Sequence, residues 1–347
     1  IQMPDSYLHT SIPVKIPDKA DEKIIYSNFV YNGGGYVIEN LHSSGGLFDR
    51  LVSSHIKNTI LKNVVLSVDK ETEYIGAMAN AVITTTFGKD ENISASGNSM
   101  IDHCAVIGSN FNIAAEIKYV GSIVGYGGYI CDTYSTNCYM YAREKSTVQY
   151  MGGIAGGASE ITGCAITGYN VEGLKVDDTY NIINLGGVVA DGSGFPIERN
   201  NHTFQYIGCS VSDTAVRDIV LNNAQNIGGI MCSAGGANSP YITRCYISNS
   251  VMNGNVTGSI VGYDGESLMV HTVSFVIVDD TNKYPNIGQA SESSETATVF
   301  GTQIIRVPFD GLKVDGVTYI LGEKWTRNSN INDGYAIPKE LTIFLEQ

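Results

Sequence analysis

The stretch Gly121-Ser122-Ile123-Val124-Gly125-Tyr126 occurs a second time, unchanged, as Gly258-Ser259-Ile260-Val261-Gly262-Tyr263. Looser copies surround these two, and their first glycines are Gly45, Gly76, Gly152, Gly186 and Gly228. Successive first glycines are separated by 31, 45, 31, 34, 42 and 30 residues. A unit that returns at such intervals, with variable insertions, is typical of a solenoid. The repeat therefore predicts one elongated stack of coils.

A second set of positions lies between the glycine motifs. Each is a small or apolar residue in a short apolar stretch, and the set comprises Thr59, Cys104, Cys138, Cys164, Cys209, Cys245 and Val273. Equivalent positions of neighbouring coils lie one strand spacing apart, about 4.8 Å. We therefore expect the five cysteines to stack in a single inward-facing file of small hydrophobic side chains. We also expect the chain's seven cysteines to be free thiols rather than a disulfide framework.

Strand and turn residues dominate every unit. Short runs rich in Ile, Val, Tyr and Thr are separated by Gly, Asn, Asp and Ser, which is the composition of strands and turns. A helical repeat would need apolar residues at i, i+3, i+4 and i+7 over ten or more residues. The sequence thus predicts an all-β fold, a right-handed parallel β-helix whose stacked coils share one core.

Three segments are expected along the chain. Residues 1–25, which include three prolines, form an N-terminal arm or cap, and residues 26–305 form the β-helix. Residues 306–347 contain the only tryptophan, Trp325. We expect this tail to cap the last coil, because an open coil end exposes an unpaired strand edge. The alternative for the tail is a linker to a further domain.

At this point the sequence resembles a known family. The Gly-Gly-Ile-Val-Gly-like segments, the strand Asn32–Leu41 and the Ile-x-x-Cys-x-Val strands look like those of GLUG-motif repeat proteins. Such proteins are large secreted or surface-attached bacterial proteins, notably of gut Bacteroidetes, and are described as adhesins. The resemblance covers roughly residues 28–290 and implies a β-helix scaffold at an extracellular or cell-surface location. It says little about function, because the family's repeats serve as scaffold in proteins of different activities.

Charge and hydropathy limit the partners. With 21 basic and 35 acidic residues the net charge is −14, which disfavours nucleic acid, since binding it requires a basic surface. No apolar run approaches the roughly 20 residues of a membrane span, so no membrane insertion is expected. The chain starts at Ile1 without a signal peptide, and we expect any export signal or lipid anchor to have been removed.

Catalysis on a β-helix would require paired carboxylates, or calcium-binding carboxylates with a basic residue. The candidates are Asp132, Asp177-Asp178 and Asp279-Asp280, and we interpret each as a solvated turn residue. His103, which flanks the cysteine file, is interpreted as a surface or turn residue. No Cys/His spacing of the zinc type occurs. The sequence therefore predicts no catalytic residue, no metal site and no cofactor.

Tyrosine is the remaining candidate for binding. The chain has 21 tyrosines, and Tyr126, Tyr129 and Tyr263 lie near expected turns. Exposed tyrosines can stack on sugar rings or contact a protein partner. The alternative is that these rings form aromatic ladders that stiffen neighbouring coils.

The sequence favours a non-catalytic adhesion or interaction module at a bacterial surface, whose partner is a glycan or protein on a host or bacterial surface. The first alternative is a carbohydrate-active enzyme, a polysaccharide lyase or glycosidase, with its site on one of the long insertions Gly76–Cys104 and Gly186–Cys209. Two or more carboxylates converging beside those insertions would favour that alternative. The second alternative is a structural stalk.

Overall fold

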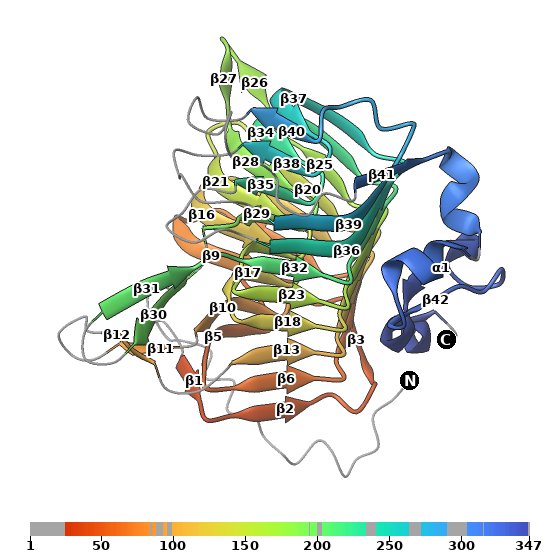
Figure 1. Cartoon of the computed structure of the whole chain (residues 1–347). Helices are drawn as coiled ribbons and strands as arrows, with labels where there is room; N and C mark the ends of the chain where they lie inside the picture. Colours follow the sequence, from red (N-terminus) through yellow and green to blue (C-terminus); the bar gives the residue numbers. More distant parts are fainter. Residues whose placement is uncertain are drawn as a thin grey trace.

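The computed structural model describes residues 25–83, 85–87, 93–95, 99–193, 195–199, 203–233, 241–263, 272–289, 304–314 and 316–345. In this part of the chain, short strands wind into a parallel β-helix (Figure 1). Three sheets of 9, 15 and 11 strands run along the stack of coils. The predicted fold class is confirmed. Of the expected N-terminal arm, residues 1–24 lie outside the described residues.

The strands fall into five stacks, and strands of successive coils pair in parallel. The first stack contains β1 (Ile25–Ser27), β5 (Phe48–Val52), β10 (Ala79–Ile83), β17 (Val124–Gly127), β22 (Ala155–Gly157), β29 (Val189–Asp191), β35 (Met231–Ser233), β38 (Val261–Tyr263) and β40 (Ile287–Gln289). The second contains β2 (Val30–Asn32), β6 (His55–Lys57), β13 (Met100–Asp102), β18 (Tyr129–Cys131), β23 (Glu160–Thr162) and β32 (Ser210–Ser212).

The third stack contains β3 (Val37–Glu39), β7 (Ile60–Lys62), β14 (Ala105–Ile107), β19 (Tyr134–Thr136), β24 (Ala165–Thr167), β33 (Ala215–Arg217) and β41 (Ile304–Val307). The longer β36 (Tyr241–Ser248) and β39 (Thr272–Asp279) continue both the second and the third stack. The fourth contains β4 (His42–Ser43), β8 (Val65–Val68), β15 (Asn110–Ile113), β20 (Tyr139–Ala142) and β25 (Asn170–Glu172). The fifth contains β9 (Thr72–Gly76), β16 (Glu116–Gly121), β21 (Thr147–Gly152) and β28 (Ile182–Gly186), and β34 (Val220–Gly228) and β37 (Val251–Gly258) continue the fourth and fifth.

The glycine column of the sequence is a column in space. Gly76, Gly121, Gly152, Gly186, Gly228 and Gly258 pair with one another from coil to coil at the end of the fifth stack. A Cβ atom on Gly152 would collide with the carbonyl oxygen of Ala155, three residues further along the chain. The backbone folds so tightly here that no side chain fits, which is why the glycine recurs in each coil.

The corner between the second and third stacks requires a left-handed backbone in each coil. Its residues have φ between 47° and 65°, and they are Asn58, His103, Asp132, Gly163, Asp213, Arg244 and Phe275. Gly, Asn and Asp adopt this conformation at the lowest cost. The corner between the third and fourth stacks follows the same rule with Asn63, Gly108, Asn137, Gly168, Asp218 and Asn249.

After six of the corners between the second and third stacks, the next residue is buried and its side chain donates a hydrogen bond backwards. Cys104 Sγ and Cys164 Sγ lie 3.2 and 3.3 Å from the carbonyl oxygens two residues earlier. The Thr133 hydroxyl makes the same contact at 2.7 Å. A small side chain with a donor closes this bend, and a thiol or a hydroxyl meets that need. This explains why the column alternates as Thr59, Cys104, Thr133, Cys164, Thr214, Cys245.

The expected single file of five cysteines is wrong for two of them. Cys138 is level with Ser109 at the next corner of the coil. Cys209 is level with Ser159 at the corner that precedes the second stack. The late member of the column is Val276 rather than Val273. All seven cysteines are free thiols, and six of them are buried.

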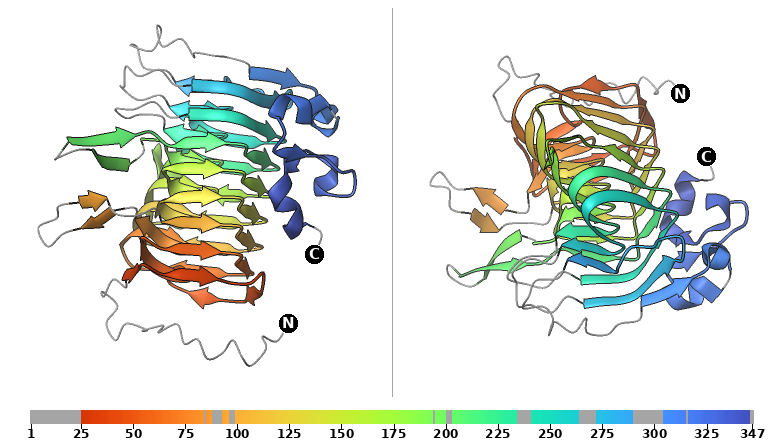
Figure 2. Two further views of the ribbon diagram at one scale, coloured as in Figure 1. Left: turned by 60° about the horizontal axis from the view of Figure 1, so that its bottom comes forward. Right: turned by 90° about the horizontal axis from the view of Figure 1, so that it is seen from above.

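Two β-hairpins leave the helix at one corner, between the first and second stacks. They pair β11 (Thr85–Phe87) with β12 (Ile93–Ala95), and β30 (Phe195–Arg199) with β31 (Thr203–Ile207). The strands β12 and β30 are in contact, and both hairpins project from the same side of the helix (Figure 2). They belong to the two insertions that the sequence marks as longest. A third hairpin, β26 (Lys175–Val176) with β27 (Thr179–Tyr180), leaves between the fourth and fifth stacks.

The C-terminal segment lies along the side of the helix, whereas we expected it to cap the last coil (Figures 1 and 2). It contains η3 (Phe309–Lys313), α1 (Gly316–Leu321), β42 (Trp325–Thr326), η4 (Asn332–Gly334), β43 (Ile337–Pro338) and η5 (Lys339–Phe344). Its buried side chains form a second apolar cluster with the outward column of the third stack, which comprises Ile60, Ala105, Tyr134, Ala165, Ala215, Tyr246 and Ile277. This apolar column requires a cover, and that requirement accounts for the position of the segment.

Polar contacts hold the C-terminal segment against several successive coils of the β-helix. The Tyr246 hydroxyl donates to the carbonyl oxygen of Ala336 at 2.9 Å. Arg217 pairs with Asp333 at 2.9 Å, and its guanidinium carbon lies 4.6 Å from the centroid of the Tyr335 ring. No helix among the described residues is long and apolar enough to cross a membrane.

Candidate functional site

Four tyrosines meet where the first and fifth stacks adjoin. Tyr74, Tyr119 and Tyr150 occupy one position in three successive coils, so their rings lie a strand spacing apart. The ring centroids of Tyr119 and Tyr150 are 4.9 Å apart with the planes at 14°. Tyr126, on β17, stacks against Tyr74 with centroids 5.3 Å apart and planes at 20°. The result is a continuous cluster of aromatic rings across three coils.

This tyrosine cluster is partly exposed and carries charge at its edges. Tyr119 is 7% exposed, and the other three rings are half-buried. The Tyr119 hydroxyl donates to Asp191 Oδ2 at 2.9 Å. Burial, and then the charge of Asp191, raises the pKa of Tyr119 far above its usual range, so the hydroxyl remains a donor. The guanidinium of Arg50 lies 5.4 Å from the centroid of the Tyr74 ring.

The structure does not bring the three predicted tyrosines together. Tyr126 belongs to the cluster. Tyr263 occupies the same position of the first stack four coils further on, about 19 Å away at one strand spacing per coil. Tyr129 lies in the second stack, beyond the corner. Whether these residues bind a ligand stays a prediction.

The other three members of the cluster are not among the residues predicted from the sequence. A signal for them exists, because each stands two residues before a glycine of the repeat column. The stretches are Tyr74-Ile75-Gly76, Tyr119-Val120-Gly121 and Tyr150-Met151-Gly152. Since the glycines align in space, the tyrosines that keep this spacing must align as well.

Tyr129 lines a hollow of about 210 Å³ on the second stack, together with Met100, Ile130, Cys131, Glu160 and Thr162. The Sγ atom of Cys131 lies 3.2 Å from the Met100 sulfur. Burial, and then the nearby carboxylates of Asp102, Asp132 and Glu160, raises the pKa of Cys131 to about 12. A nucleophilic cysteine requires a lowered pKa, so this thiol is not activated for attack.

The acidic candidates have different surroundings. Asp177 and Asp178 form the turn of the hairpin β26–β27, and Asp178 is solvated and pairs with Lys175 at 2.9 Å. Asp279 is fully buried and accepts from the Ser248 hydroxyl at 2.5 Å, so its interpretation as a solvated turn residue is wrong. Asp132 is half-buried at a coil corner, close to Asp102 and His103.

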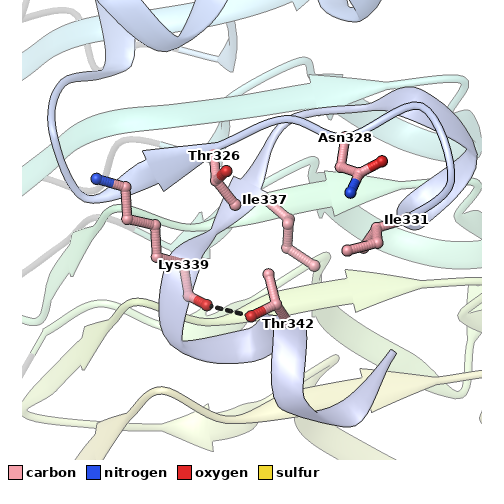
Figure 3. A pocket seen from close by; sticks show the side chains of 6 residues that line it. All are labelled: Thr326, Asn328, Ile331, Ile337, Lys339 and Thr342. Carbon is pink, nitrogen blue, oxygen red and sulfur yellow. Dashed lines mark hydrogen bonds between the residues drawn. The ribbon is translucent and has the colours of Figure 1, made fainter. Parts of the chain in front are cut away.

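A second hollow, of about 260 Å³, lies within the C-terminal segment (Figure 3). Its lining consists of Thr326, Asn328, Ile331, Ile337, Lys339 and Thr342. The Thr342 hydroxyl donates to the carbonyl oxygen of Lys339 at 2.8 Å. These lining residues include no carboxylate, imidazole or thiol, so this hollow offers neither a carboxylate pair nor a metal-binding set.

No family model matches the chain, and a comparison with curated proteins gives no match. Among solved structures, a protein described as a "putative immunoglobulin A1 protease from Bacteroides ovatus" is similar. It shares 17% sequence identity, and the match covers 89% of this chain and 76% of that chain with a TM-score of 0.45. A likeness at this level carries no conclusion about the activity of the chain, because one fold supports unrelated functions.

Proposed function

We propose that this chain is a non-catalytic, surface-exposed or secreted binding module that recognises a glycan through the tyrosine cluster. The observation that carries the proposal is the stacking of Tyr74 on Tyr126, next to the stacked pair of Tyr119 and Tyr150. Fixed aromatic rings offer large contact area with little loss of conformational entropy on binding. Sugar rings present apolar faces of matching size, and their hydroxyls can hydrogen-bond to polar groups at the edge of the cluster, such as Arg50 and its exposed partner Glu73.

The surroundings of the cluster support a ligand longer than one sugar. The rings of Tyr74, Tyr119 and Tyr150 follow the axis of the helix over three coils. The hairpins β11–β12 and β30–β31 leave the helix at the end of the first stack, which also carries Tyr126. An extended chain of sugars lying along the coils would meet the exposed parts of Tyr74, Tyr126 and Tyr150. The resemblance to GLUG-motif proteins and the acidic composition agree with a surface-exposed binding role, and the proposal draws on both.

A glycan array with mucin-type and bacterial surface glycans tests the proposal. We expect Tyr126→Ala to weaken binding by roughly 30-fold, the equivalent of the about 2 kcal/mol typical of an aromatic anchor. The matched control is Tyr139→Ala, which removes an exposed tyrosine of the fourth stack and should leave binding unchanged. A bound glycan that ignores Tyr126→Ala would contradict the proposal. Turnover of a polysaccharide would instead favour the enzyme alternative.

A further inference from the structure

One coil corner carries side chains of the metal-binding type that the glycan proposal does not use. Asp102 ends β13, His103 occupies the corner that follows, and Asp132 occupies the same corner one coil further on. Each residue offers a donor atom, and these three atoms lie within 4.8 Å of one another. The repeat of the fold thus places residues that are distant in the sequence around one point.

The imidazole of His103 is oriented by its neighbours. Asp102 Oδ1 accepts a hydrogen bond from His103 Nδ1–H at 2.6 Å. With the proton on Nδ1, the lone pair of the neutral ring is on Nε2. Nε2 lies 3.7 Å from Oε2 of Glu340, on η5 of the C-terminal segment. A carboxylate that fixes the tautomer of a histidine in this way is the usual support of a metal ligand.

His55 contacts the same carboxylate, since its Nε2 lies 3.7 Å from Asp102 Oδ2. Asp102 therefore lies between two imidazoles, and it orients His103 instead of binding an ion itself.

The charges at this corner favour a cation. Asp102, Asp132 and Glu340 bring three carboxyl groups together. A divalent ion would offset the repulsion among these carboxylates.

We propose that this corner binds a divalent transition-metal ion of the zinc class through His103 Nε2, Asp132 and Glu340, with Asp102 orienting the His103 ring from the Nδ1 side. Bonds of about 2.0–2.2 Å place two donors of one ion roughly 3 to 4 Å apart. The measured 3.7 Å fits this range, and the 4.8 Å limit requires only small side-chain rotations. An imidazole with few carboxylates suits zinc, whereas calcium takes six to eight oxygens. The ion fastens the C-terminal segment to two coils.

Isothermal titration calorimetry of the chelator-treated full chain with zinc chloride tests the site. We expect one zinc ion per chain and much weaker binding of calcium chloride. His103→Asn is the informative variant, because the same corner one coil earlier holds Asn58 with φ of 50°. The backbone therefore tolerates this change, and loss of binding cannot be attributed to unfolding. We expect His103→Asn and Asp132→Asn each to weaken zinc binding at least about tenfold.

The control variant is His42→Asn, which removes an exposed histidine of β4 and should leave zinc binding unchanged. Limited proteolysis supplies a second readout, since zinc should slow cleavage within the C-terminal segment. Glu340→Gln should remove that protection. The proposal is overturned if the chain takes up no zinc up to about 1 mM, or if His103→Asn binds zinc as the unaltered chain does. It is also overturned if calcium binds as tightly as zinc. None of these outcomes depends on whether the tyrosine cluster binds a glycan.

Discussion

Trp325 offers a direct test of how the C-terminal segment is held. Its ring is 2% exposed and packs against Tyr246 of the third stack, with the ring centroids 5.6 Å apart. We consider Trp325→Ala. Because Trp325 belongs to the segment and Tyr246 belongs to the coils, this change removes contact area between them while leaving every coil intact.

The structure sets the magnitude of the effect. Replacing a buried tryptophan by alanine costs about 3–5 kcal/mol. However, Trp325 Nε1 is buried without a hydrogen-bond partner among the described residues, and deleting an unsatisfied donor returns about 1–3 kcal/mol. At the midpoints of the two ranges, the net loss in the docking of the segment is about 2 kcal/mol. At about 1.4 kcal/mol per tenfold change, opening of the segment becomes roughly 30-fold more frequent.

Native-state hydrogen exchange measures this opening. The amides of Trp325 and Lys339 donate to carbonyl oxygens within the segment, and we expect both to exchange roughly 30-fold faster in Trp325→Ala. The amide of Ile123 donates to the carbonyl oxygen of Ile154 between coils, and its exchange should not change. Trp325→Phe is the matched control, since it keeps a ring against Tyr246 and removes the unsatisfied N–H. Its effect should stay below about threefold.

Two results would refute this reasoning. If the Ile123 amide accelerates as much as that of Trp325, the segment and the coils unfold as one unit. If Trp325→Phe opens the segment as much as Trp325→Ala does, the indole N–H has a partner, and the offset used above is absent.

Three further predictions concern the coils themselves. Because the pKa of Cys131 is raised to about 12 from a reference of 9.0, its thiolate at pH 8 should be about a thousandfold scarcer than that of a free thiol. Mass spectrometry should therefore show slow alkylation of Cys131 that accelerates as the pH rises. Rapid labelling of Cys131 at pH 8 would contradict this. Gly152→Ala places a Cβ against a carbonyl oxygen, and chemical denaturation should show a loss of stability of about 1–3 kcal/mol or more. The control is Gly316→Ala, which has open space around it and should change stability by less than about 1 kcal/mol. Arg244→Asn removes the two hydrogen bonds of 2.6 and 2.8 Å to the fully buried carboxylate of Asp213. It should cost about 2 kcal/mol, less than the about 3 kcal/mol of an unpaired buried charge, because Lys324 stays 3.6 Å from Asp213 and asparagine fits the left-handed corner better than arginine. The added change Asp213→Asn should restore part of that loss, and no recovery would mean that the buried charge is not the cause.

The glycine column was predictable from the sequence because a backbone constraint fixes both the residue type and its place in the coil. Only glycine fits at Gly152, so every coil shows the same letter at the same point, and the spacing gives the coil length directly. The cysteine file was mispredicted for the opposite reason. Several corners of a coil accept the same small donor residues, as Ser109 and Cys138 show, so residue type alone does not identify the corner.

The position of the C-terminal segment could not be predicted from the spacing of the repeats, because that spacing does not show which outer face of the coils is apolar. The outward column of the third stack mixes large and small residues, as in Tyr134 followed by Ala165 one coil later. Both faces of β19 and β24 are buried, which the short strands do not reveal on their own. The proximity of His103 and Asp132 could have been predicted from the sequence, because Asp132 follows His103 by one coil length.

The left-handed corners connect the fold to its side-chain chemistry. A residue other than Gly, Asn or Asp costs on the order of 1 kcal/mol or more in this conformation, so a departure from these three types needs a compensating interaction. Arg244 is one such residue, and it shares the neutralisation of the buried Asp213 with Lys324. His103 departs and lies against Asp102, beside Asp132. Phe275 departs as well, and nothing in the structure explains it. In a fold built from repeats, the positions that break the local backbone preference and also gain a charged partner are therefore the first places to look for function.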